Sequence, residues 1–229
     1  MQKYYLFDFD GTLVDSMPIY VSSMLRILDE NGIAYGDDII KIITPLGVNG
    51  AAEYYTKTLG LRKSKDELVD LMKRYMLDAY CNTIPAKENV ISVLTALKHR
   101  GDSLNVLTAS PHITLDACLK RLDIYDLFDN VWSCDDFHTT KANPAIYVMA
   151  ASKLNKHVED VWFLDDNLGA DTTAKAAGMK VCGVYDDSSK EYAEEIKAVA
   201  DEYIYNFSEL LSLPLFGGDS SCAMPHTMI

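Results

Sequence analysis

The sequence has 229 residues, of which 48% are hydrophobic and 24% charged, a composition typical of a globular protein with one large or two small domains. Its formal net charge of −13 argues against nucleic acid and against anionic membranes as partners, because both attract basic surfaces.

Five scattered cysteines form no CxxC pair, so the sequence offers neither a disulfide framework nor a zinc site. No apolar run approaches the roughly 20 residues that span a bilayer, and the N-terminus does not resemble a signal peptide. We therefore expect a cytoplasmic protein, present as a monomer or a weak dimer.

The first expected element is an apolar strand over residues 4–7, which Asp8 and Asp10 follow directly. Such a run is typical of a buried parallel strand, and side chains at its carboxyl end face the crevice where ligands bind. Alternation places Asp8 and Asp10 on the same side, while Gly11 lets the backbone turn away sharply. Both carboxylates can therefore act on one reacting centre.

Residues 16–80 show helical spacing of their apolar side chains, and we expect them to form helices only. Ser64 and Glu67 fit a capping box, which predicts that a helix begins there. The segment Thr44–Gly50 is expected to join two helices, and its Gly47 permits close approach of the backbone to a ligand; an ordinary interhelical turn is the alternative. The expected helices cover residues 16–31, 49–60 and 64–76.

From about residue 81 strands alternate with helices, which implies βαβ units and a parallel sheet. The predicted fold class is therefore α/β: a doubly wound, mostly parallel sheet with an inserted helical domain. We assign residues 1–15 and 81–213 to the α/β core, 16–80 to the insertion and 214–229 to a flexible tail. The expected strands are 103–108, 130–133, 161–164 and 180–184, with a last strand and helix over 203–212; the expected helices are 87–100, 111–122, one from 144, one through 174–177 and one near 190–199.

Further polar residues stand where other strands end, in the same position as Asp8 and Asp10. Thr108 and Ser110 follow one buried strand, Asp165 and Asp166 follow another, and Lys141 precedes a helix. Each group alone has a simpler explanation, since a threonine here is commonly a turn residue and paired acids before a helix are often N-caps. In a doubly wound sheet, however, all these positions converge on one crevice.

Together these motifs resemble the haloacid dehalogenase superfamily, and within it the phosphoglycolate phosphatase and beta-phosphoglucomutase subgroup with a helical cap. Four motifs stand in the family's order over residues 3–210: Asp8-Phe9-Asp10-Gly11-Thr12, Thr108, Lys141 and Asp165-Asp166. The segment Lys141-Ala142-Asn143-Pro144 departs from the family's usual spacing of prolines, which affects only the expected loop shape.

The resemblance implies catalytic roles for Asp8, Asp10, Thr108 and Lys141. Asp8 is the expected nucleophile, which takes the phosphoryl group as an aspartyl-phosphate, and Asp10 is the expected acid and then base. Thr108, Ser110, Lys141 and Gly47 are the expected substrate-binding residues.

The resemblance also implies Mg²⁺ as cofactor, because this cation prefers oxygen ligands and often bridges carboxylates to a substrate phosphate. The expected ligands are Asp8, Asp166 and the backbone carbonyl of Asp10, with Asp165 either a direct ligand or a group that holds bound water. Asp171 is interpreted as a helix-surface residue.

The expected function is that of a Mg²⁺-dependent phosphatase acting on a small phosphorylated metabolite. A sugar phosphomutase of the beta-phosphoglucomutase type is the alternative within the same family, and a catalytically idle phosphate-binding module is a third interpretation. The intact set of reactive residues favours an enzyme, and the acid two residues after the nucleophile favours phosphoryl transfer over dehalogenation, in which halide leaves without a proton.

Overall fold

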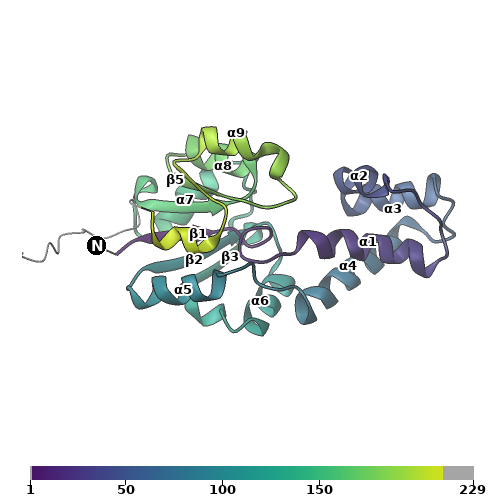
Figure 1. The fold of residues 1–229 in the computed structure, drawn as a ribbon, viewed down its shortest axis with the longest axis horizontal. Helices are drawn as coiled ribbons and strands as arrows, with labels where there is room; N and C mark the ends of the chain where they lie inside the picture. Colours follow the sequence, from purple (N-terminus) through teal and green to yellow (C-terminus); the bar gives the residue numbers. More distant parts are fainter. Residues whose placement is uncertain (1, 214–229) are drawn as a thin grey trace, which may run out of the picture.

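The computed structural model describes residues 2–213, so the tail predicted over residues 214–229 lies outside the described residues. It consists of a central sheet with helices on both faces, and of a group of helices that lies beyond the carboxyl end of β1 (Figure 1). No described helix has both the length and the apolar composition needed to cross a membrane.

The sheet has six strands, all parallel, in the order β3-β2-β1-β4-β5-β6. The chain leaves β1 toward one edge and then returns to its other side, so the order reverses next to β1, and ligands bind at such a reversal. The predicted doubly wound α/β fold is confirmed. The strands are β1 (Tyr4–Phe7), β2 (Ser103–Thr108), β3 (Asn130–Ser133), β4 (Val161–Asp165), β5 (Lys180–Val184) and β6 (Glu202–Ile204).

Alternation along β1 sends neighbouring side chains into separate apolar layers on the two faces of the sheet. Tyr5 and Phe7 pack with residues of α5 and α6, whereas Leu6 packs with residues of α7 and α8. In the view of Figure 1, α5 and α6 lie below the sheet and α8 and α9 above it. The helices of this part are α5 (Val90–His99), α6 (His112–Arg121), α7 (Ala145–Lys153), α8 (Leu168–Ala176) and α9 (Ala193–Val199).

The inserted helices build an apolar cluster of their own, which contains Met24, Tyr55 and Leu68 among its fully buried members. The capping box of Ser64 and Glu67 is present, as predicted. Helix α4 passes the predicted boundary at residue 80, and its last turn packs against the core. The four helices are α1 (Met17–Glu30), α2 (Ile39–Ile43), α3 (Gly47–Lys57) and α4 (Lys65–Asn82).

The segment between α1 and α3 differs from the prediction. The structure has a short helix, α2, and a 3₁₀ turn over Thr44–Leu46, and α3 begins at Gly47, within the segment expected to be a connecting loop. One helical turn is too short to show a period in the sequence, so its apolar residues gave no helical signal.

Two antiparallel stretches connect the insertion to the core. Val14 forms an antiparallel bridge with Ala86, and the amide of Asp15 donates a hydrogen bond to the carbonyl of Pro85 at 3.0 Å. The chain therefore leaves and re-enters the core at one place, beside the loop that follows β1.

Candidate active site

The acids predicted at the ends of β1 and β4 meet in the structure. The register pairs Phe7 with Leu164, and the amide of Asp8 donates a hydrogen bond to the Leu164 carbonyl at 2.8 Å. Asp8 therefore lies level with Asp165. Ligand oxygens of Asp8, Asp165 and Asp166 all lie within 4.8 Å of one another, and all three residues are buried.

Lys141 is the cation that contacts this acidic group. Its Nζ donates to Asp8 Oδ1 and, at 2.8 Å, to Asp165 Oδ2. Burial by itself lowers the pKa of Lys141, but the Asp165 and Asp8 carboxylates outweigh it and raise the pKa above the ordinary lysine value. The hydroxyl of Tyr147 donates to the Lys141 carbonyl at 3.1 Å and fixes the backbone there.

The Asp8 carboxylate is buried, and only one of its two oxygens accepts a hydrogen bond from the described residues. Burial, and next the Asp165 carboxylate, raise the pKa of Asp8 to about 7, although Lys141 acts in the opposite direction. Lys141 occupies Oδ1, and within residues 2–213 no hydrogen bond reaches Oδ2. That second oxygen is free to react.

Asp166 is positioned by the loop that follows β1. The Thr12 hydroxyl donates to Asp166 Oδ1 at 3.0 Å, and Gly11 adopts a φ of +77° beside it. A Cβ on Gly11 would lie 2.5 Å from Asp166 Oδ2, so glycine is needed both for the backbone and for the space. Burial is the largest of the causes that raise the pKa of Asp166.

Asp10 is held by two hydroxyl groups. The Tyr80 hydroxyl, from the last turn of α4, donates to Asp10 Oδ1 at 2.5 Å, and the Ser110 hydroxyl donates to Oδ2. Burial and the neighbouring carboxylate raise the pKa of Tyr80, so its phenol stays protonated and can donate. Thr108 is buried close by, and its Oγ1 accepts from the Ser110 amide at 3.0 Å.

The interpretation of Asp171 as a helix-surface residue is wrong. Its side chain is fully buried, and neither carboxylate oxygen has a hydrogen-bond partner among the described residues. Burial, and next the Asp165 and Asp166 carboxylates, raise its pKa well above the ordinary range. Asp171 shares a face of α8 with the buried Ala174, three residues on, and this spacing was the available signal.

The donor set fits a divalent cation bound by oxygen. Three buried carboxylates lie together, and Lys141 forms ion pairs with only two of them, Asp8 and Asp165. Hard cations such as Mg²⁺ prefer carboxylate oxygens of this kind.

The acidic group opens into a cavity of about 850 Å³. We call it the phosphoryl cavity. Six of the predicted site residues line this cavity: Asp8, Asp10, Thr108, Lys141, Asp165 and Asp166. Ser110 does not line it but donates a hydrogen bond to Asp10, which does. Gly47 does not line it either, and the insertion contributes Thr44 instead. Sequence reasoning missed the contributions of Thr12 and Tyr80. Thr12 is the last residue of the first motif, although no role was assigned to it, whereas Tyr80 gave no signal beyond its place in a helix.

The reversal of strand order, with clustered acids at the carboxyl ends of β1 and β4, defines an α/β enzyme with an acidic active site. Residues 5–184 match the family model of haloacid dehalogenase-like hydrolases. The chain belongs to this family, and the predicted family and the predicted class of enzyme are confirmed.

The chain is similar to several phosphatases. It is 29% identical to a phosphoglycolate phosphatase from Colwellia psychrerythraea over 216 residues, covering 90% of this chain and 94% of the relative. It is 28% identical to the pyrophosphatase PpaX from Bacillus velezensis over 182 residues, covering 78% and 81%. A solved structure of a candidate beta-phosphoglucomutase from Thermotoga maritima has the same fold, with a TM-score of 0.80 at 22% identity over 92% of this chain and 97% of the other.

Proposed function

We propose that this protein is a Mg²⁺-dependent phosphatase that hydrolyses a small phosphorylated metabolite through an aspartyl-phosphate on Asp8. One observation carries the proposal: Asp8 has one oxygen bound by Lys141 and one open, next to two further carboxylates at the reversal of the sheet. An open carboxylate oxygen is a nucleophile, and the lysine beside it offsets the charge of an incoming phosphate.

In the proposed reaction, Asp8 Oδ2 attacks phosphorus as the bond from phosphorus to the leaving oxygen breaks. Asp10 gives that oxygen a proton, and then takes one from the water that hydrolyses the aspartyl-phosphate. Tyr80 and Ser110 orient Asp10, because their hydroxyls hold both of its oxygens. Thr108 and Lys141 line the cavity where they can bind the non-bridging phosphoryl oxygens.

Asp8, Asp166 and the backbone carbonyl of Asp10 would hold Mg²⁺, with Asp165 as a further ligand or a holder of bound water. When bound, Mg²⁺ supplies positive charge between the carboxylates and the phosphoryl group. Thr12 and Gly11 keep Asp166 in place for this purpose.

The names of the similar sequences favour hydrolysis over mutase chemistry, since both sequence relatives described above are phosphatases. The mutase-like structure is only 22% identical and supports the fold alone. We also propose that the protein acts in the cytoplasm, which is consistent with the free thiols of the described cysteines.

The nucleophile can be tested with Asp8→Asn, which is nearly isosteric. Turnover of p-nitrophenyl phosphate should fall below about 1% of wild type, because losing covalent catalysis costs orders of magnitude. Asp126→Asn, an exposed carboxylate far from the site in the sequence, is the matched control and should keep full activity. In Asp10→Asn the aryl phosphate should leave a covalent phosphate on Asp8, visible by mass spectrometry. Activity retained in Asp8→Asn would refute the proposal.

A further inference from the structure

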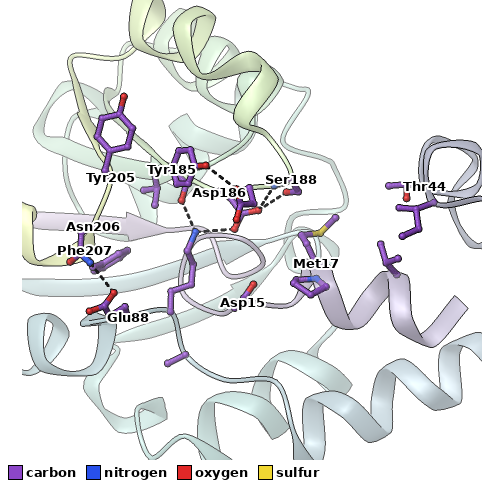
Figure 2. Close-up of a pocket in the computed structure, with 17 residues that line it drawn as sticks. Asp15, Met17, Thr44, Glu88, Tyr185, Asp186, Ser188, Tyr205, Asn206 and Phe207 are labelled. Atoms are coloured by element: carbon purple, nitrogen blue, oxygen red, sulfur yellow. Dashed lines mark hydrogen bonds and ion pairs between the residues drawn. The ribbon is translucent and has the colours of Figure 1, made fainter. Parts of the chain in front are cut away.

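A second cavity, of about 770 Å³, adjoins the phosphoryl cavity. We call it the side cavity. Met17, Thr44 and Ser188 line both cavities, so the two are neighbours that share a rim at these three residues. Figure 2 shows the side cavity, with Thr44 of the insertion facing Met17 and the loop that carries Asp186 and Ser188. Its volume is in the range that holds small organic ligands.

A second space near Asp10 is separate from the phosphoryl cavity. A groove between α4 and α6 lies beyond Asp10, but it shares no lining residue with the phosphoryl cavity. Tyr80 and Ser110, which line this groove, both donate hydrogen bonds to Asp10 and so form the wall between the two spaces. Of these two neighbouring spaces, only the side cavity shares lining residues with the phosphoryl cavity.

The lysine that lines the side cavity has no donor left for a ligand. Lys87 Nζ donates to the Gly11 carbonyl at 2.6 Å, to the Tyr185 carbonyl at 2.6 Å and to Asp186 Oδ2 at 2.9 Å. An ammonium group has three protons, so these contacts use all of them. No other lysine, arginine or histidine of the described chain lines this cavity.

The remaining charges of the side cavity are negative. Asp15 and Glu88 line it and are exposed to solvent. Asp186 is paired with Lys87, and the exposed Asp187 lies 3.9 Å from the ammonium of Lys190. The rings of Tyr185 and Tyr205, with centroids 5.6 Å apart, form an aromatic part of the lining. Carboxylates and ring faces repel anions, accept hydrogen bonds from hydroxyl groups and attract cations.

We propose that the side cavity receives the leaving group, and that it selects phosphate monoesters whose leaving group is uncharged or cationic over those that carry a second anionic group. This inference rests on the proposed phosphatase function. It predicts that a polyol or amine attached to the phosphate is accepted, whereas a carboxylate or second phosphate on the leaving group is rejected.

Three substrates of nearly equal size test the selection: 2-hydroxyethyl phosphate, phosphoethanolamine and 2-phosphoglycolate, which carry a hydroxyl, an ammonium and a carboxylate at the same place. We expect kcat/KM for phosphoglycolate to be about tenfold or more below the other two, a ratio within the reach of a few partly screened charges. In 1 M salt, where the Debye length is about 3 Å, the ratio should shrink.

The two hypotheses fail in different ways. If none of the three substrates nor p-nitrophenyl phosphate is hydrolysed, the proposed function is refuted. If phosphoglycolate is hydrolysed as well as or better than the others, only the inferred selection is refuted.

Two variants test which space is responsible for the selection among leaving groups. The double variant Asp15→Asn with Glu88→Gln should raise the phosphoglycolate to hydroxyethyl phosphate ratio of kcat/KM about threefold or more, because two negative charges of the side cavity are gone. Asp70→Asn removes the same kind of charge from the groove between α4 and α6, and should leave the ratio unchanged. A ratio that responds to Asp70→Asn and not to the double variant would place the leaving group in that groove and overturn the inference.

Discussion

Replacing Gly11 by alanine should damage the active site far more than the fold. Gly11 has a φ of +77°, and an added Cβ would lie 2.5 Å from Asp166 Oδ2 and 2.7 Å from its Cγ. Ordinary contacts begin at 3.4 Å, so the Asp166 carboxylate has to move by about 0.9 Å. Cγ and Oδ1 of Asp166 would both lie 2.7 Å from the added Cβ, so the whole side chain has to swing away, at the expense of its hydrogen bond from Thr12.

The two consequences differ in size. An alanine at positive φ costs about 1–2 kcal/mol of folding free energy, which the protein can tolerate. A shift of roughly 1 Å in a group that positions the reaction can cost about 100-fold in rate, and displaced ligand geometry weakens metal binding by about 10–100-fold. Gly11→Ala should therefore remain folded and lose most of its kcat and its Mg²⁺ affinity.

Gly32→Ala is the matched control, since Gly32 has a φ of +65° at the end of α1 and nothing within 4 Å of an added Cβ. Both variants should lose a similar free energy of unfolding in urea. Only Gly11→Ala should lose turnover of p-nitrophenyl phosphate and need more Mg²⁺ for half-maximal rate. If Gly11→Ala keeps its rate within about threefold of the control, Asp166 is not positioned for catalysis in the way described.

Three further outcomes are expected. Chelator should abolish turnover and Mg²⁺ should restore it, while Ca²⁺ should inhibit because its looser coordination shell disturbs the geometry of the reaction. Mg²⁺ should also raise the Tm of wild type but not that of Asp166→Asn. Full activity in the presence of chelator would contradict a metal site. Tyr80→Phe should lower kcat for an alkyl phosphate roughly tenfold, because Asp10 loses a hydrogen bond that orients it. The same variant should change the burst with p-nitrophenyl phosphate little. Equal losses on both substrates would mean that Tyr80 has a purely structural role. The hydrogen bonds of His112 to Asp116 and then to Asp136 raise its pKa, so their contribution to stability is complete below pH 6.5 and is lost as the pH rises through the raised pKa. Because solvent reaches these partly exposed pairs and screens them, the Tm of wild type should fall only about 1–3 °C more than that of His112→Gln over this range. Identical pH profiles of the two proteins would exclude the effect.

The parts of the site that follow strands could be predicted from the sequence. Asp8 and Asp165 stand at the carboxyl ends of apolar runs, and parallel strands in register bring those ends to one edge of the sheet. The chemistry then follows from residue types alone, because the topology of a doubly wound sheet leaves a single crevice for them. The roles of these residues remain predictions until the variants are measured.

The parts that depend on packing between distant elements could not be predicted. Tyr80 reaches Asp10 across 70 positions of sequence because the last turn of α4 packs on the core, where its ring stacks on Phe9 with centroids 5.9 Å apart. Asp171 was assigned to the surface because an acid in a helix is usually solvated, whereas this one faces other buried acids. The contact between Tyr80 and Asp10 leaves no local pattern in the sequence, and the burial of Asp171 leaves only its spacing of three residues from Ala174.

The whole chain is acidic, and yet the substrate proposed for it is an anion. The two are compatible because the repulsion between them is screened at long range. A net charge of −13 repels a phosphate in the bulk, but salt screens that field within about 8–10 Å. Attraction must therefore act at short range, and Lys141, buried against Asp8 and Asp165, supplies it only to a group that has entered the phosphoryl cavity. The side cavity has no such cation to offer, because Lys87 is used within the fold. The same distribution of charge that admits one phosphoryl group thus disfavours a second anion beside it.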